Sequence, residues 1–256
     1  MDMDSSIAPV NSPLPPSDSP SLPPAASPLP LPWGLAAVCA AGGVVFACLA
    51  GGVFAGKVGM LGGLWINGLV FPVGGTGVAL LVLGQGRWRE LIDRLGLSLR
   101  RGDSARATLA GIYGGVGAFA VAIPLVLVSQ WGLGWFGMEP PPNWLVMRLR
   151  DHPRLDVWIS ISVLVLVVAP VAEEILFRVV LVEAFEAAEL PAAAALSALV
   201  FAAVHGRLDQ LLGLCVLALW LYRLRMRYDS LRPAILAHAV FNALVLSGTF
   251  RQLTQT

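Results

Sequence analysis

Long apolar stretches with few charged residues dominate the chain between residues 33 and 250. The longest uncharged runs are residues 35–56, 58–86 and 107–138. Each run can cross a hydrocarbon core of about 30 Å, because a helix rises about 1.5 Å per residue. Only helices fit this pattern, since open sheet edges have no hydrogen-bond partners in lipid. We therefore expect an all-α, polytopic membrane protein with about seven transmembrane helices, at residues 33–54, 61–83, 105–130, 157–185, 190–206, 209–225 and 232–250.

Two segments between the predicted spans carry polar and aromatic residues. Residues 87–101 repeat apolar positions at helical spacing among arginines, which predicts an amphipathic helix at the membrane interface. Residues 131–156 combine tryptophans with three consecutive prolines. Because tryptophan prefers the headgroup layer, this segment is expected to be an interfacial loop.

The N-terminal tail differs in composition from the rest of the chain. Residues 1–32 hold ten of the nineteen prolines and contain no Lys or Arg, which predicts a disordered tail. The chain then divides into the tail at 1–32, N-terminal membrane helices at 33–130, the interfacial loop at 131–156, and a helical bundle at 157–256.

Composition and charge support a membrane protein and give no reason to expect nucleic-acid binding. The chain is 57% hydrophobic and 13% charged, against about 25% charged residues in soluble domains, and its net charge is only +1. Arginines gather in residues 87–106 and 223–232, which seven spans place on one side of the membrane. The positive-inside rule makes that side cytoplasmic, together with the N-terminus. The glycines of a GxxxG pattern, Gly111 and Gly115, predict close helix packing within the chain.

Two carboxylates and a guanidinium interrupt the apolar span at residues 157–185. A charge at mid-membrane costs about 2.5–3.5 kcal/mol, so three unpaired charges would cost on the order of 8–10 kcal/mol. Glu174 and Arg178 are four residues apart and are expected to pair on one helix face. Glu173 lies about 100° around the helix and is expected to face a cavity.

Polar residues also stand inside two later spans. His205 closes the predicted span at 190–206, while His238 and Asn242 are four residues apart on one face of the last span. A carboxylate, two imidazoles and an amide suffice to activate a water molecule and to stabilise an oxyanion. The same two histidines with one glutamate would also suit a zinc ion with an open position.

These motifs, Glu-Glu-x-x-x-Arg at 173–178, Phe-x-x-x-His at 201–205 and His-x-x-x-Asn at 238–242, resemble those of the CPBP intramembrane proteases. That family includes CAAX prenyl endopeptidases of the Ras-converting type and bacterial bacteriocin-processing or immunity proteins. The resemblance covers about residues 157–250 and includes the residues that lead up to the last motif.

The resemblance implies a role for each motif residue. Glu173 and His205 would activate the attacking water, and His238 and Asn242 would stabilise the tetrahedral oxyanion. The supporting residues would be Glu174 and Arg178.

We therefore expect an intramembrane endopeptidase that needs neither a cofactor nor a metal ion. A zinc-dependent protease of the same family is the nearest alternative, followed by a non-enzymatic immunity or scaffold protein and, more distantly, an ion or proton transporter. The expected partners are membrane lipid and a substrate that is a membrane protein, a prenylated peptide or a leader peptide. We expect an integral protein of the plasma membrane.

Overall fold

The computed structural model describes residue 74, residues 76–77, residue 95 and residues 104–254, except for the side chain of residue 144. The regular structure in these ranges is entirely helical, which confirms the predicted class. Apart from residues 74, 76–77 and 95, the predicted tail, the first two predicted spans and the predicted interfacial helix lie outside the described residues. The count of seven spans is therefore not confirmed.

The described helices follow one another along the chain from residue 104 to residue 254. Their bounds are α5 (Ser104–Gly134), α6 (Trp144–Asp151), α7 (Leu155–Val163), η2 (Leu164–Val168), α8 (Ala169–Glu174), η3 (Ile175–Val180), α9 (Leu181–Ala187), α10 (Ala193–Val204), η4 (Leu208–Gln210), α11 (Leu211–Tyr228) and α12 (Leu231–Thr254). The elements η2 and η3 are π-helical turns, and η4 is a short 3₁₀ turn. The chain stays helical from Leu155 to Ala187, but its hydrogen-bond register changes on both sides of α8.

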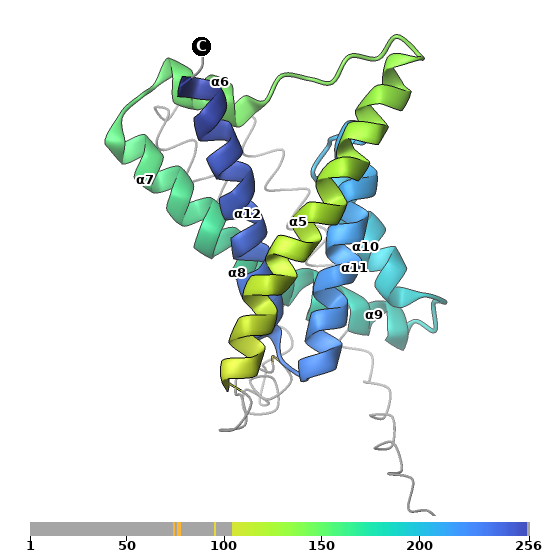
Figure 1. The fold of residues 1–256 in the computed structure, drawn as a ribbon. Helices are drawn as coiled ribbons and strands as arrows, with labels where there is room; N and C mark the ends of the chain where they lie inside the picture. Colours follow the sequence, from red (N-terminus) through yellow and green to blue (C-terminus); the bar gives the residue numbers. More distant parts are fainter. Residues whose placement is uncertain (1–73, 75, 78–94, 96–103, 255–256) are drawn as a thin grey trace, which may run out of the picture.

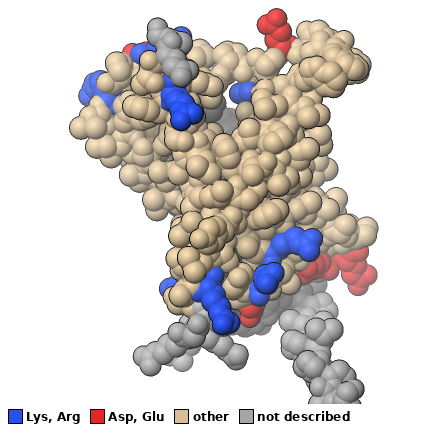
Figure 2. All heavy atoms as spheres, viewed as in Figure 1, with Lys and Arg blue, Asp and Glu red and all other residues tan. Residues whose placement is uncertain are grey.

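Three helices of the described part are long and apolar enough to cross a membrane, namely Ser104–Gly134, Leu155–Ala187 and Leu231–Thr254. They coincide with three of the predicted spans. The spans predicted at 190–206 and 209–225 correspond to α10 and α11, and α10 has only 12 residues. Figure 2 shows charged side chains gathered at two opposite ends of the visible face, with uncharged side chains between them. This distribution suits a molecule whose middle lies in lipid.

The segment predicted as an interfacial loop contains a helix, so that prediction was wrong for α6. The preceding helix α5 also continues to Gly134, beyond the predicted end at residue 130. The side chain of Asn143 caps α6 by accepting hydrogen bonds from the backbone N–H groups of Leu145 and Val146. Such a cap stabilises a short helix where the surrounding prolines and tryptophans suggest a loop.

Helix α5 crosses α12 and α11 at close range (Figure 1). A Cβ atom at Gly115 would stand 2.5 Å from the carbonyl oxygen of Ala237, and one at Gly111 would stand 2.9 Å from the Cβ atom of Leu236. Both glycines of the GxxxG pattern therefore serve the contact between α5 and α12. This confirms the prediction that they pack helices within the chain.

The largest buried cluster joins α5, η3, α10, α11 and α12. The ring of Phe201 is fully buried in it and meets the ring of Phe177 edge to face, with centroids 5.1 Å apart. Phe201 thus anchors α10 against the helix that carries the glutamate pair. The cluster holds together the three segments on which the motif residues stand.

Candidate functional site

A buried ion pair lies at the centre of the site. The side chains of Glu174 and Arg178 are 0% and 1% exposed, and Nε of Arg178 lies 3.2 Å from Oε2 of Glu174. These two atoms are not aligned for a hydrogen bond, whereas Nη2 of Arg178 donates to Oε1 of Glu174 at 3.4 Å. The pair that the spacing of four residues predicts is therefore confirmed.

His238 of α12 reaches both glutamates of α8. Its Nδ1 atom lies 3.0 Å from Oε1 of Glu174, and its Nε2 atom lies 3.8 Å from Oε2 of Glu173. An ionised carboxylate only accepts hydrogen bonds, so Nδ1 is the donor to Glu174. The side chain of Glu173 is 13% exposed, whereas that of Glu174 is fully buried. Glu173 is therefore the more accessible carboxylate, and it faces an imidazole rather than empty space.

The helix around the glutamate pair is irregular on both sides. The π-turn η2 precedes α8 and the π-turn η3 follows it, with Pro170 in the first turn of α8. Short π-turns inside α-helices occur frequently at functional sites. In the sequence, the signal for such a distortion is Pro170, because a proline inside a helix removes one backbone hydrogen bond.

Arg178 is held from two further directions. Its guanidinium carbon lies 5.0 Å from the centroid of the Phe201 ring, within cation–π range. Its backbone carbonyl accepts a hydrogen bond from Nη1 of Arg225 at 2.6 Å. Nη2 of Arg225 also lies 3.5 Å from Oε1 of Glu183. In the sequence, Arg225 contributes to the arginine bias, and its position near the end of an apolar helix was the only signal for this contact.

Two buried hydroxyls also reach this helix from other segments. Oγ of Ser197 donates to the carbonyl of Phe177 at 2.6 Å, and Oγ1 of Thr76 donates to the carbonyl of Ala172 at 3.2 Å. Extra donors of this kind serve carbonyls whose backbone partners change where the helical register changes. A lone serine in the apolar helix α10 was the sequence signal for the first contact.

His205 stands at the C-terminal cap of α10, beside the group of charged residues around Glu174 rather than inside it. Its Nδ1 atom donates to the carbonyl of Phe201 at 2.7 Å, and the ring is exposed. The centroid of the Phe201 ring lies 4.8 Å from that of the His205 ring and 5.9 Å from that of the His238 ring, so Phe201 stands beside both histidines. Within the described part of the chain, His205 makes no hydrogen bond or ion pair with Glu173.

Asn242 lies one turn after His238 but contacts a different group. Its Nδ2 atom donates to the carbonyl of Val165 in η2 at 2.9 Å, and its side chain is half-buried. Among the described residues, its hydrogen bonds do not reach the glutamates. The structure therefore brings Glu173, Glu174, Arg178 and His238 together and places Asn242 and His205 beside that group.

A second polar cluster fixes the turn that follows His205. Asp209 is 2% exposed and accepts two hydrogen bonds from the guanidinium of Arg207, at 2.8 and 2.7 Å. Nε2 of Gln130 in α5 donates to the same carboxylate at 3.0 Å. The hydrogen bond from Arg207 holds the pKa of the Asp209 carboxyl below its ordinary value, although burial acts in the opposite direction. This cluster was not predicted from the sequence, because Gln130 lies far from Asp209 along the chain.

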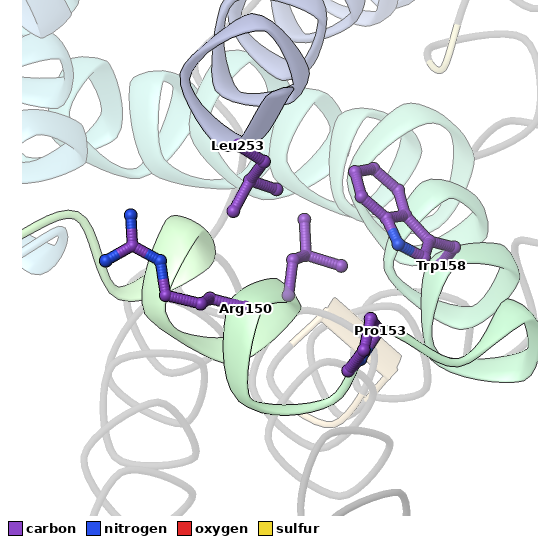
Figure 3. Close-up of a pocket in the computed structure, with 5 residues that line it drawn as sticks. Arg150, Pro153, Trp158 and Leu253 are labelled. Atoms are coloured by element: carbon purple, nitrogen blue, oxygen red, sulfur yellow. The ribbon is translucent and has the colours of Figure 1, made fainter. Parts of the chain in front are cut away.

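The described residues hold no group of three or more His, Cys, Asp or Glu side chains arranged to bind a metal ion. A hollow of about 470 Å³ lies at another place, where α6, α7 and α12 meet. Figure 3 shows Arg150, Pro153, Trp158 and Leu253 around it. None of the motif residues lines this hollow.

The long apolar helices point to an integral membrane protein. Residues 155–244 match the model of the family described as Type II CAAX prenyl endopeptidase Rce1-like, and this segment contains all three motifs. This segment is similar to the Rce1-like family, which is a family of proteases. Comparisons with curated proteins and with solved structures gave no match.

Proposed function

We propose that the protein is an intramembrane endopeptidase of the CAAX-prenyl-protease type, which hydrolyses a peptide bond with an activated water molecule. The position of His238 between Glu173 and Glu174 is the observation that carries the proposal. The buried Arg178 compensates the charge of Glu174, so Glu173 is the carboxylate left to act on a ligand. A general base of this kind must come within hydrogen-bond reach of the proton that it removes.

The gap between Glu173 and His238 suits a bridging oxygen atom. At 3.8 Å, the Oε2 and Nε2 atoms are too far apart for a direct hydrogen bond, and a water molecule commonly bridges such a distance. In the proposed reaction, Glu173 takes a proton from this water while the oxygen attacks the substrate carbonyl, whose π electrons move onto its oxygen to form an oxyanion. The oxyanion then collapses, the C–N bond breaks, and Glu173 gives its proton to the leaving amine. In its doubly protonated form, His238 donates through Nδ1 to Glu174 and through Nε2 to the developing oxyanion.

His205 and Asn242 complete the proposed machinery. A carbonyl only accepts hydrogen bonds, so the contact with Phe201 places a proton on Nδ1 of His205. The neutral ring then has a free lone pair on Nε2, as a base that assists Glu173 requires. Asn242 has two N–H groups, and the one that does not bind Val165 is proposed to support the oxyanion.

The proposed substrate is a membrane-associated polypeptide, either a prenylated C-terminal peptide, a leader peptide or another membrane protein. The family match supports the prenylated peptide as the first choice for assay. The arginine bias supports an orientation with the N-terminus in the cytoplasm, and we propose the plasma membrane as the location.

The test compares Glu173→Gln with the native protein in liposomes, using fluorogenic peptides with and without a prenyl group. Glutamine keeps the size of the side chain and removes the base, so cleavage should fall by about 10²-fold or more while the thermal transition is unchanged. Glu186→Gln is the matched control, because Glu186 is an exposed carboxylate on the same continuous helix. Full activity of Glu173→Gln would place the general base elsewhere.

The same assay separates the alternatives. A non-enzymatic immunity or scaffold protein would cleave none of the peptides, and Glu173→Gln would then change nothing. A zinc-dependent protease would lose activity with a chelator and regain it with zinc. The compensation of Glu174 by Arg178 supports the metal-free reaction, because a fixed positive charge beside the carboxylates disfavours a second cation.

A further inference from the structure

The hydrogen-bond register of η2 leaves a backbone carbonyl without its usual donor. The N–H of Ala169 donates to the carbonyl of Leu164, five residues earlier in the chain. The same register, continued by one residue, assigns the N–H of residue 170 to the carbonyl of Val165. Residue 170 is proline, which has no N–H. In a regular α-helix, Pro170 would leave the carbonyl of Leu166 without a donor, but the π-turn moves the affected carbonyl to Val165.

Asn242 of α12 donates to that carbonyl. Its Nδ2 atom lies 2.9 Å from the Val165 oxygen, and the two residues are 77 positions apart. Backbone groups have no water partner inside a membrane, and proline is tolerated there where a neighbouring helix supplies the missing partner. The side-chain amide thus occupies the place of a backbone N–H.

We propose that Asn242 is a positioning residue that replaces the N–H missing at Pro170 and thereby fixes the register of α8 against α12. Pro170 stands three residues before Glu173, and each residue turns an α-helix by about 100°. A change of register at Pro170 would therefore rotate both glutamates away from His238. Asn242 and His238 are one turn apart on α12. The same face of α12 therefore contacts Val165 before Pro170 and Glu174 after it. Only the step from this geometry to proteolysis rests on the proposed function.

A double-mutant cycle on the full-length protein tests the proposal. The variants are Asn242→Leu, which removes the donor, Pro170→Ala, which restores the backbone N–H, and both changes together. In the native background, Asn242→Leu should raise the unfolding equilibrium constant at least about threefold, since a buried acceptor loses its partner. In the Pro170→Ala background, the same change should raise it by less than about twofold, because the restored N–H can donate to Val165.

The matched control is Ser247→Ala, which removes a side-chain donor that bonds within α12, to the carbonyl of Leu244. This change should show no coupling to Pro170→Ala. Equal effects of Asn242→Leu in both backgrounds would overturn the proposal.

A spectroscopic measurement covers the case in which Pro170→Ala does not fold. The carbonyl ¹³C signal of labelled Val165 should shift in Asn242→Leu, whose side chain has a similar size but no donor. It should stay unchanged in Ser247→Ala. An unchanged Val165 signal in Asn242→Leu would contradict the proposal, because a residue that only stabilises the oxyanion does not act on this carbonyl in the absence of substrate.

These measurements need no peptide cleavage, so they are independent of the proposed function. If coupling and a Val165 shift are found in a protein that cleaves no peptide, the positioning role of Asn242 is supported and the proposed proteolytic function is contradicted. If the native protein cleaves peptide but shows neither coupling nor a shift, the proteolytic function is supported and the positioning role is contradicted.

Discussion

Nδ1 of His238 lies 3.0 Å from Oε1 of Glu174, although the two residues are 64 positions apart in the chain. This contact joins the last transmembrane helix to the helix that carries the glutamate pair. Glu174 is at the same time paired with Arg178, so one buried carboxylate receives donors from two helices. Nε2 of the same imidazole lies 3.8 Å from Oε2 of Glu173, the more accessible carboxylate. The geometry around Glu173, the proposed base, therefore depends on His238, which the fully buried Glu174 holds in place.

Arg178→Ala should destabilise the protein as well as inactivate it. The change leaves the carboxylate of Glu174 buried without its main counter-charge, and breaking a buried pair costs about 3–5 kcal/mol. Reversible unfolding in mixed micelles measures the loss. Arg227→Ala, at an exposed position of α11, is the control and should stay within about 0.5 kcal/mol. A fully stable but inactive Arg178→Ala would show that Arg178 acts on the reaction alone.

Gly115→Ala should be destabilising, although alanine is the better helix former. A Cβ atom there would stand 2.5 Å from the carbonyl oxygen of Ala237, so α5 and α12 must separate. Overpacking of this kind costs about 1–3 kcal/mol.

Gly132→Ala in the same helix is the control for this prediction, because a Cβ atom there has nothing within 4 Å. It should be neutral or stabilising by up to about 1 kcal/mol. Thermal unfolding of both variants measures the difference. Equal transition temperatures would mean that α5 and α12 are not held at this distance.

Asp209 should make stability depend on pH in the acid range. Its pKa in the folded protein is lowered by the hydrogen bond from Arg207, whereas the unfolded value is about 3.9. The contribution is therefore fully present above the unfolded pKa and is lost as the pH falls through the lower, folded pKa. Asp209→Asn should lower stability at pH 6 and should flatten the decline below about pH 4. Unfolding measured from pH 6 to pH 3 tests this, and parallel curves for the two proteins would contradict it.

We predict that the purified protein holds no stoichiometric zinc. The motif histidines stand on different helices, without the HExxH arrangement that places two ligands on one helix face. An amide such as that of Asn242 is also a poor zinc ligand. Metal analysis of the active protein measures the content directly. One zinc per chain, with activity lost to a chelator and restored by zinc alone, would establish the zinc-dependent alternative.

Short-range relationships were predictable from the sequence. The pairing of Glu174 with Arg178 follows from a spacing of four residues on a helix, and the packing of Gly111 and Gly115 follows from a small-residue pattern. Three predicted spans coincide with helices because apolar length alone determines which segments can cross a membrane. The helix α6 was missed because its cap at Asn143 stands among residues that favour a loop.

Apolar length and the placement of polar residues were enough to predict the helical class, several of the candidate membrane-spanning segments and the types of side chain available for the proposed catalysis. Three contacts between helices could not be predicted: His238 lies between the two glutamates, Asn242 donates to the carbonyl of Val165, and Gln130 donates to Asp209. The physical reason is that backbone geometry fixes contacts within one helix turn. Contacts between helices depend on how the helices cross and on their register, which the packing of the whole core sets.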